Sequence, residues 1–315
     1  MTDDRKRIHA ENIFEKLWKA YDRRDIEILK DFDLLKLDSY QITRGGHELK
    51  LTIEIDADNM LIRLSSELDI DVPQSRRTDM AVCICKANCE LNEGVFEYDI
   101  LEGRIIFRMA RFYEACELTD SYLTEMHFRA GMVIDEFYGE FERLSSGEVS
   151  RDALLGELDM KKHHKWKASE EYEETADAVF DMLAVALKEK GFVMRAFRKM
   201  RMFYIDIPNG ERSIGVMVRL DADEQIINIA VPFEVEVRRE TAPDVAALAC
   251  AVTEQLVSGG ISFDFLKGTI YYNTSTSFLD GGISSKAFLG IVGMSSEIFR
   301  CYNNKFKKIS SGETE

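Results

Sequence analysis

The chain has 315 residues, of which 45% are hydrophobic and 31% charged, and this composition excludes wholesale disorder and leaves room for two ordinary domains. The formal net charge of -16 disfavours a nucleic-acid partner, because binding a phosphate backbone requires concentrated Lys and Arg. No run of 18 apolar residues occurs, and residues 1–10 lack the apolar core of a signal peptide. The sequence therefore predicts a cytoplasmic protein that has no membrane partner.

The first predicted element is a helix that follows a polar, frayed start at residues 1–9. Apolar residues recur there at the three-and-four spacing of one helical face, namely Ile13, Phe14, Leu17, Trp18 and Tyr21. A second face with the same spacing lies 166 residues further on, at Val179, Phe180, Leu183, Ala184 and Leu187.

Three strands are predicted after this helix, at residues 38–43, at residues 48–55 and from Met60 onward. A Gly-Gly turn joins the first two and supplies the positive φ that a tight hairpin needs. The third follows an Asp-Ala-Asp turn at residues 56–58, which lacks the Gly and Glu of a calcium-binding loop. The second half of the chain repeats the pattern at residues 201–205 and 212–220 and again has Asp-Ala-Asp, at residues 221–223.

A central helix at residues 76–91 and a hairpin at residues 94–110 form the clearest repeat in the chain. The helix returns at residues 243–257, where Thr241 is a candidate cap and Pro243 suits the first turn. Nine positions recur without a gap when 165 is added to their numbers: Asp79, Ala81, Cys85, Leu91, Gly94, Asp99, Leu101, Gly103 and Ile105. We infer a tandem duplication.

A long helix closes each copy, and its apolar face at residues 123–141 recurs at residues 288–306. The expected domains are a first repeat at residues 1–148, a linker at residues 149–167 and a second repeat at residues 168–315. Each repeat is predicted to run helix, three strands, helix, two strands, helix. Because hairpins join most strands, we expect an α+β fold with mainly antiparallel sheets.

This element order, with Val72-Pro73 before the central helix and a Gly just after it, resembles the YbjN family. The resemblance covers residues 39–141 and 202–306, although the second copy has Val237-Arg238 in place of Val72-Pro73. It implies a fold like that of the type III secretion chaperones, in tandem. Members of the family are described as candidate regulators of sensory transduction, and the chaperones as dimers that bind segments of other proteins.

No residue pattern predicts a catalytic, cofactor-binding or metal-binding site, and we expect no cofactor. Cys83, Cys85 and Cys89 cannot converge on one ion from a helix, and Leu248 and Glu254 replace the first and third in the second copy. The five histidines form no catalytic cluster: His9, His47, His127, His163 and His164. The basic run at residues 161–167 with Trp166 is interpreted as a solvated tether.

The favoured function is therefore that of a non-enzymatic protein-binding module, chaperone-like or regulatory, built as an intramolecular pseudo-dimer. Its partner is expected to be a protein or peptide, and a basic one would suit the first 150 residues, where most of the acidic excess lies. A small-ligand binder or an enzyme with an unrecognised site stays open as the alternative, as does a purely structural role. The charges Asp135, Glu140 and Glu142 align with Arg300, Lys305 and Lys307, which suggests complementary surfaces between the copies.

Overall fold

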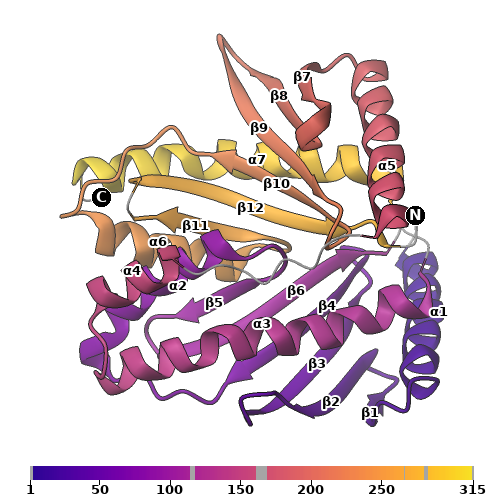
Figure 1. The fold of residues 1–315 in the computed structure, drawn as a ribbon, viewed down its shortest axis with the longest axis horizontal. Helices are drawn as coiled ribbons and strands as arrows, with labels where there is room; N and C mark the ends of the chain where they lie inside the picture. The colour runs from indigo at the N-terminus through magenta and orange to yellow at the C-terminus, as the bar shows by residue number, and fades with distance from the viewer. Residues whose placement is uncertain (1–2, 114–117, 161–168, 266, 280–282, 314–315) are drawn as a thin grey trace.

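The computed structural model describes residues 3–113, 118–160, 169–265, 267–279 and 283–313. Each half of this described chain builds one six-stranded antiparallel sheet, and helices pack against it (Figure 1). The α+β class and the antiparallel sheets are confirmed, and the layout of two similar sheets is compatible with a tandem duplication.

The first sheet has the strand order β1-β2-β3-β4-β6-β5. Alternating residues of β3 are buried, which is the period expected of a strand with one face on a core. The elements of this half are α1 (Asp3–Asp22), β1 (Ile28–Asp31), β2 (Lys36–Ile42), β3 (Glu48–Asp56), β4 (Leu61–Leu68), η1 (Gln74–Arg76), α2 (Arg77–Glu90), β5 (Val95–Asp99), β6 (Arg104–Phe112) and α3 (Asp120–Ser146).

The second sheet has the order β11-β12-β10-β9-β8-β7, which is the same topology once the strands are matched between the copies. Its elements are α5 (Glu170–Glu189), β7 (Val193–Phe197), η2 (Arg198–Met200), β8 (Met202–Asn209), β9 (Arg212–Asp221), β10 (Ile226–Pro232), α6 (Ala242–Gln255), β11 (Gly260–Asp264), β12 (Thr269–Ser277) and α7 (Ser285–Ser311).

Three local predictions were wrong. Each copy has a fourth strand before its central helix, β1 or β7, and both are short and mostly exposed, so they lack the alternation that marks a strand. Residues 3–9 are helical rather than frayed, and an ion pair between Arg7 and Glu11 (Nε–Oε1 2.9 Å) supports that turn. Thr241 occupies the N-cap position of α6 but its side chain makes no capping bond there.

The segment expected as a linker, residues 149–167, begins with a helix, α4 (Arg151–Met160). Its side chains Leu154, Leu155 and Leu158 are buried, and the helix packs against α2. Burial of three leucines stabilises the helix by roughly 1.5–3 kcal/mol per side chain, which explains why so short a segment is ordered. The rest of the linker, residues 161–167, lies outside the described residues.

The two copies pack against each other through their central helices, with α2 beside α6. Cys85 Sγ lies 3.8 Å from Cys250 Sγ, and these residues occupy the same position in the two copies. The contact is reciprocal, since Cys85 Sγ donates to Ala246 O (3.7 Å) and Cys250 Sγ to Ala81 O (3.9 Å). Equivalent residues that meet their own counterparts define an approximate two-fold axis, as in a symmetric dimer.

A second equivalent pair, Val95 and Gly260, also meets at this axis. A Cβ added to Gly260 would lie 2.4 Å from Val95 Cγ2, so the close approach of β5 and β11 requires glycine in one copy. Three of the complementary charges of the last helices, Asp135, Arg300 and Lys307, make contacts away from this interface. Asp135 accepts from Gly45 N, Arg300 pairs with Glu297, and Lys307 pairs with Glu234, each within its own copy.

Candidate functional site

Cys85 and Cys89 on α2 have different contacts. Cys85 faces Cys250, whereas Cys89 donates to Cys85 O, and Cys116 lies outside the described residues. Burial raises the pKa of Cys89 to about 12 and that of Cys83 further still. Within the described chain no group of His, Cys, Asp and Glu is arranged to hold a metal ion.

The described histidines are scattered over the first copy. His9 contacts the ring of Tyr113, and the ring of His47 stacks on Tyr138 with centroids 3.8 Å apart. His127 is buried on α3, 3.4 Å from Ser39 Oγ, and burial lowers its pKa to about 4. His163 and His164 lie outside the described residues. Among the described histidines, His127 contacts a serine hydroxyl, and that contact is buried between β2 and α3.

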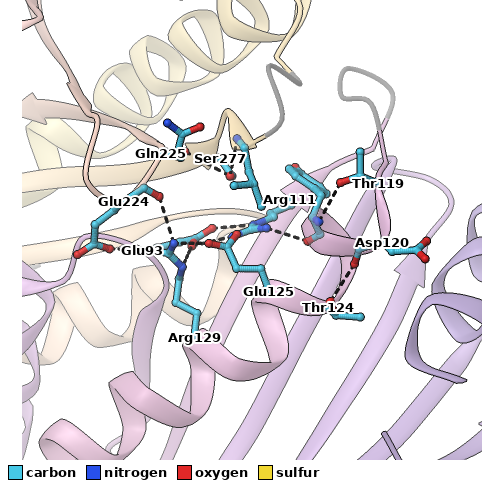
Figure 2. A network of polar contacts seen from close by, with 12 residues as sticks. Glu93, Arg111, Thr119, Asp120, Thr124, Glu125, Arg129, Glu224, Gln225 and Ser277 are labelled. Carbon is cyan, nitrogen blue, oxygen red and sulfur yellow. Dashed lines mark hydrogen bonds and ion pairs between the residues drawn. The ribbon is translucent and has the colours of Figure 1, made fainter. Parts of the chain in front are cut away.

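A network of charged side chains fills the junction of the two copies, and sequence reasoning did not identify it (Figure 2). Arg111 on β6 is fully buried and donates to both carboxylate oxygens of Glu93, over 2.7 and 2.9 Å, and to Glu125 Oε2 over 3.1 Å. Arg129 on α3 also pairs with Glu93 and Glu125. Its Nη1 donates to Glu224 Oε2 over 2.6 Å, so the network reaches the β9–β10 turn of the second copy.

The positive charges keep the buried carboxylate of Glu93 ionised. Burial alone would raise its pKa, but the charges of Arg111 and Arg129 outweigh that effect and lower it. The second copy has Ser258, Thr276, Gly290 and Met294 where the first has Glu93, Arg111, Glu125 and Arg129. The second copy therefore has no equivalent network at these positions, and the missing counterparts were the signal in the sequence that could have revealed it.

A second charged side chain, Arg108 on β6, crosses from the first copy to the carbonyl end of α6. It donates to Thr253 O (3.3 Å), Val257 O (3.2 Å) and Gly259 O (3.1 Å) while it pairs with Glu97. Cations at this end of a helix are favoured by the helix dipole. Arg108 thus caps a helix of the other copy.

The equivalent of Arg108 is the shorter Asn273, and a pocket of about 210 Å³ lies next to it. Its walls come from both copies, and Arg219, Asn228 and Ser275 contribute polar groups to it. Small-molecule sites usually occupy roughly 300–1,000 Å³, so this pocket is small for a metabolite.

The outer edges of the two sheets are formed by β1 and β7, at opposite ends of the molecule (Figure 1). Large apolar side chains are more than half exposed around β1 and β2, namely Leu29, Phe32, Leu34, Tyr40 and Ile42. A smaller group lies at β7 and the following turn, namely Val193, Phe197 and Met200. Each of these strands pairs with one neighbour in the described chain, so one row of its backbone groups is available.

The chain matches no family model and no curated protein. Among solved structures it is similar to YbjN, a candidate transcription regulator from E. coli, with 13% identity over 42% of this chain and 87% of that chain and a TM-score of 0.30. The di-domain ARO/CYC StfQ from the steffimycin biosynthetic pathway matches with 11% identity over 96% of each chain and a TM-score of 0.16. These likenesses are too distant to support an argument about function. Within the described residues, no helix combines the length and apolarity needed to cross a bilayer.

Proposed function

We propose that this protein is a non-enzymatic protein-binding module, chaperone-like or regulatory, that holds an extended basic segment of a partner protein against the outer edge of the first sheet. The observation that carries the proposal is the exposed apolar corner at β1 and β2, defined by Leu29, Phe32, Leu34, Tyr40 and Ile42, beside an open strand edge. Soluble proteins rarely leave such groups together on a surface unless the surface binds something.

The register of β1 and β2 supports binding of an extended chain. Leu29 lies directly opposite Asp38, and Tyr40 and Ile42 follow at two-residue steps along β2, so all of them share the helix-free face. An added strand would pair its backbone with β1 and place alternate side chains on this apolar strip. Backbone pairing supplies affinity, and the strip supplies preference for aliphatic or aromatic residues.

The charges near this edge favour a basic partner. Asp31 ends β1 and Asp25, Glu27 and Asp33 flank it, and all four are exposed. The neighbouring cations Lys36 and Lys50 both pair with Asp38. The one cation of β1, Lys30, lies over the Trp18 ring with Nζ 3.9 Å from its centroid. Opposite charges accelerate association and make it sensitive to salt.

The test uses a fluorescein-labelled eight-residue peptide of alternating Lys and Ile, titrated with the full chain in fluorescence anisotropy. We expect saturable binding whose affinity falls as salt is added. The double variant Tyr40→Ala and Ile42→Ser should bind the peptide about tenfold more weakly or worse. Both side chains are exposed, so their replacement should cost little stability. A peptide of alternating Glu and Ile is the control and should bind much more weakly.

Two results would contradict the proposal. One is equal binding of the Lys and Glu peptides, and the other is binding that the double variant leaves unchanged. Sedimentation of the protein alone provides a further check, because the edge of β7 carries Arg195 and is followed by Arg198 and Lys199. Self-association that the double variant abolishes would assign the β1 edge to a second copy instead of a foreign partner.

A second candidate function rests on the pocket beside Asn273. Arg219, Asn228 and Ser275 line it from three strands, and the Arg219 guanidinium fits a small carboxylate better than an apolar molecule. Isothermal titration with small dicarboxylates such as succinate would detect it. Asn273→Arg, which restores the residue of the first copy, should fill the pocket and abolish that binding.

A further inference from the structure

The helix α4 covers one face of α2 along most of its length. Arg151 Nη1 lies 3.4 Å from Asp79 Oδ1 near the beginning of both helices, and Asp159 Oδ1 lies 3.1 Å from Lys86 Nζ near the end of α4. The earlier residue of α4, Arg151, contacts the earlier residue of α2, and the later residue, Asp159, contacts the later one. The two helices therefore run in the same direction, and both contacts are spaced by about two helical turns. The buried Leu154, Leu155 and Leu158 fill the space between them.

The equivalent face of α6 has no such cover in the described chain. On α2 the positions that face α4 are buried or half-buried: Asp79, Val82, Cys83, Lys86 and Glu90. On α6 every counterpart is more exposed, namely Asp244, Ala247, Leu248, Ala251 and Gln255. Ala247 and Leu248 are half-buried, and the other three are exposed. The face is apolar in its middle and has a carboxylate at its N-terminal end.

The wall beside this face is also open. In the first copy, a groove of about 390 Å³ separates α4 from the second copy, and Phe263 and Phe265 line the side opposite α4. The Arg151 guanidinium lies 5.9 Å from the centre of the Phe265 ring. The residue equivalent to Phe265 is Ile100, which is half-buried, and the next residue, Leu101, is 80% exposed. The approximate two-fold axis thus generates a second helix site, formed by the α6 face and by a wall at Ile100 and Leu101. In that wall Tyr98 replaces Phe263 and is buried.

We propose that the face of α6 formed by Asp244, Ala247, Leu248 and Ala251 binds an amphipathic helix of a partner protein, in the position that α4 occupies on α2. The internal symmetry specifies the chemistry of that helix. It should present three aliphatic side chains with the spacing of Leu154, Leu155 and Leu158, and a Lys or Arg three positions before the first of them to meet Asp244.

The far end of the partner helix should be neutral. On α2, Lys86 pairs with Asp159 of α4, but Ala251 takes its place on α6 and offers no charge to an acidic residue. The site differs in this respect from the one α4 fills, and a partner without that acid would prefer it. The α6 face lies on the second copy, away from the β1 edge, so the inference does not depend on the proposed strand addition.

The probe for this site is a hydrocarbon-stapled, fluorescein-labelled peptide with the sequence of residues 150–160 and the substitution Asp159→Gln, which removes its pairing with Lys86. We expect saturable binding to the full chain in fluorescence anisotropy. Leu248→Asp should weaken binding by about tenfold or more, because it places a charge under the aliphatic side chains. Leu248 is half-buried, and circular dichroism of the variant checks that it folds.

A charge exchange keeps the test decisive even if Leu248→Asp perturbs the fold. Asp244 is exposed, so the Asp244→Arg variant should fold normally and bind the probe more weakly. Binding to this variant should return when the probe also carries Arg151→Asp. Tyr40→Ala with Ile42→Ser is the matched control and should leave probe binding unchanged.

Three results would overturn the inference. The first is binding that does not saturate up to about 1 mM probe. The second is probe binding that neither Leu248→Asp nor Asp244→Arg alters, and the third is dimerisation of the protein alone that Leu248→Asp abolishes. The last result would assign this face to a second copy of the chain. Loss of binding by the alternating Lys and Ile peptide would bear on the β1 edge alone.

Discussion

The central helices α2 and α6 have the same length and equivalent places in their copies, yet they differ in what surrounds them. In α2 all residues from Met80 to Asn88 are buried, because α6 covers one side and α4 another. In α6 the side that matches the α4 contact is exposed. The difference shows that neighbouring elements, more than the apolar pattern of the helix itself, decide which positions become buried.

The same contrast separates α3 from α7. Both run for 27 residues and end at a glycine with positive φ, but only α3 carries Glu125, which pairs with Arg111, and Arg129, which pairs with Glu93. Because the two copies differ in sequence, a residue near the axis does not have to pair with an identical residue of the other copy. At the positions of Glu93, Arg111, Glu125 and Arg129 the first copy has charges, and the second copy has neutral residues.

The largest expected effect comes from breaking the network of the first copy. Arg111→Met should reduce the free energy of unfolding by about 3–5 kcal/mol. The buried carboxylate of Glu93 loses the positive charge of Arg111 and keeps only that of Arg129. The double variant Arg111→Met with Glu93→Met should recover most of that loss, because no buried charge is then left without its partner. Urea denaturation of both variants provides the measurement. A single variant that loses less than about 1 kcal/mol would show that the network contributes little.

A smaller effect should appear as acid sensitivity. Burial lowers the pKa of His127 from 6.5 to about 4, so the folded protein keeps the ring neutral while the unfolded chain binds a proton. The contribution of His127 to the free energy of unfolding should therefore fall by up to about 3 kcal/mol as the pH drops from about 6.5 to about 4. His127→Val copies the second copy, which has Val292 there, and should flatten this part of the pH profile of unfolding. A profile that keeps its slope in the variant would assign the acid sensitivity to other groups.

The smallest of the three effects concerns the helix cap between copies. Arg108→Asn gives the first copy the residue of the second and removes three bonds to carbonyls at the end of α6. We expect a loss of about 1–3 kcal/mol in urea denaturation. Arg104→Asn on the same strand is the control, because that side chain is half exposed and its pair with Asp99 is weak. Equal losses in the two variants would mean that Arg108 does not hold the copies together.

Much of the fold could be predicted because the repeat shows each pattern twice. The faces of the long helices and the hairpin after the central helix recur at equivalent positions, so each copy serves as an independent check on the other. The strands β1 and β7 were missed because they are only four and five residues long and mostly exposed, so they show no period. The order in α4 was missed because its three leucines are buried by α2, a neighbour that the local sequence does not reveal.

The junction of the copies was harder to predict than the elements. Arg111 follows Ile105, Phe107 and Met109 on the buried face of β6, so its place in the core was visible in the alternation. Its partners Glu93 and Glu125 come from two other segments, and Glu224, which Arg129 binds, comes near only because the copies pack together. Local patterns cannot specify such contacts between distant segments.

Thiol labelling tests most directly whether α4 covers α2 while the matching face of α6 stays open. Cys83 lies under α4, and Leu248→Cys places a thiol at the same position of α6. Labelling the folded variant with iodoacetamide, with each site followed by peptide mass spectrometry, compares the two positions within one molecule. We predict that the introduced thiol at position 248 reacts at least about tenfold faster than Cys83, because burial also raises the pKa of the Cys83 thiol. Equal labelling rates at the two sites would contradict the claim that the α6 face is open.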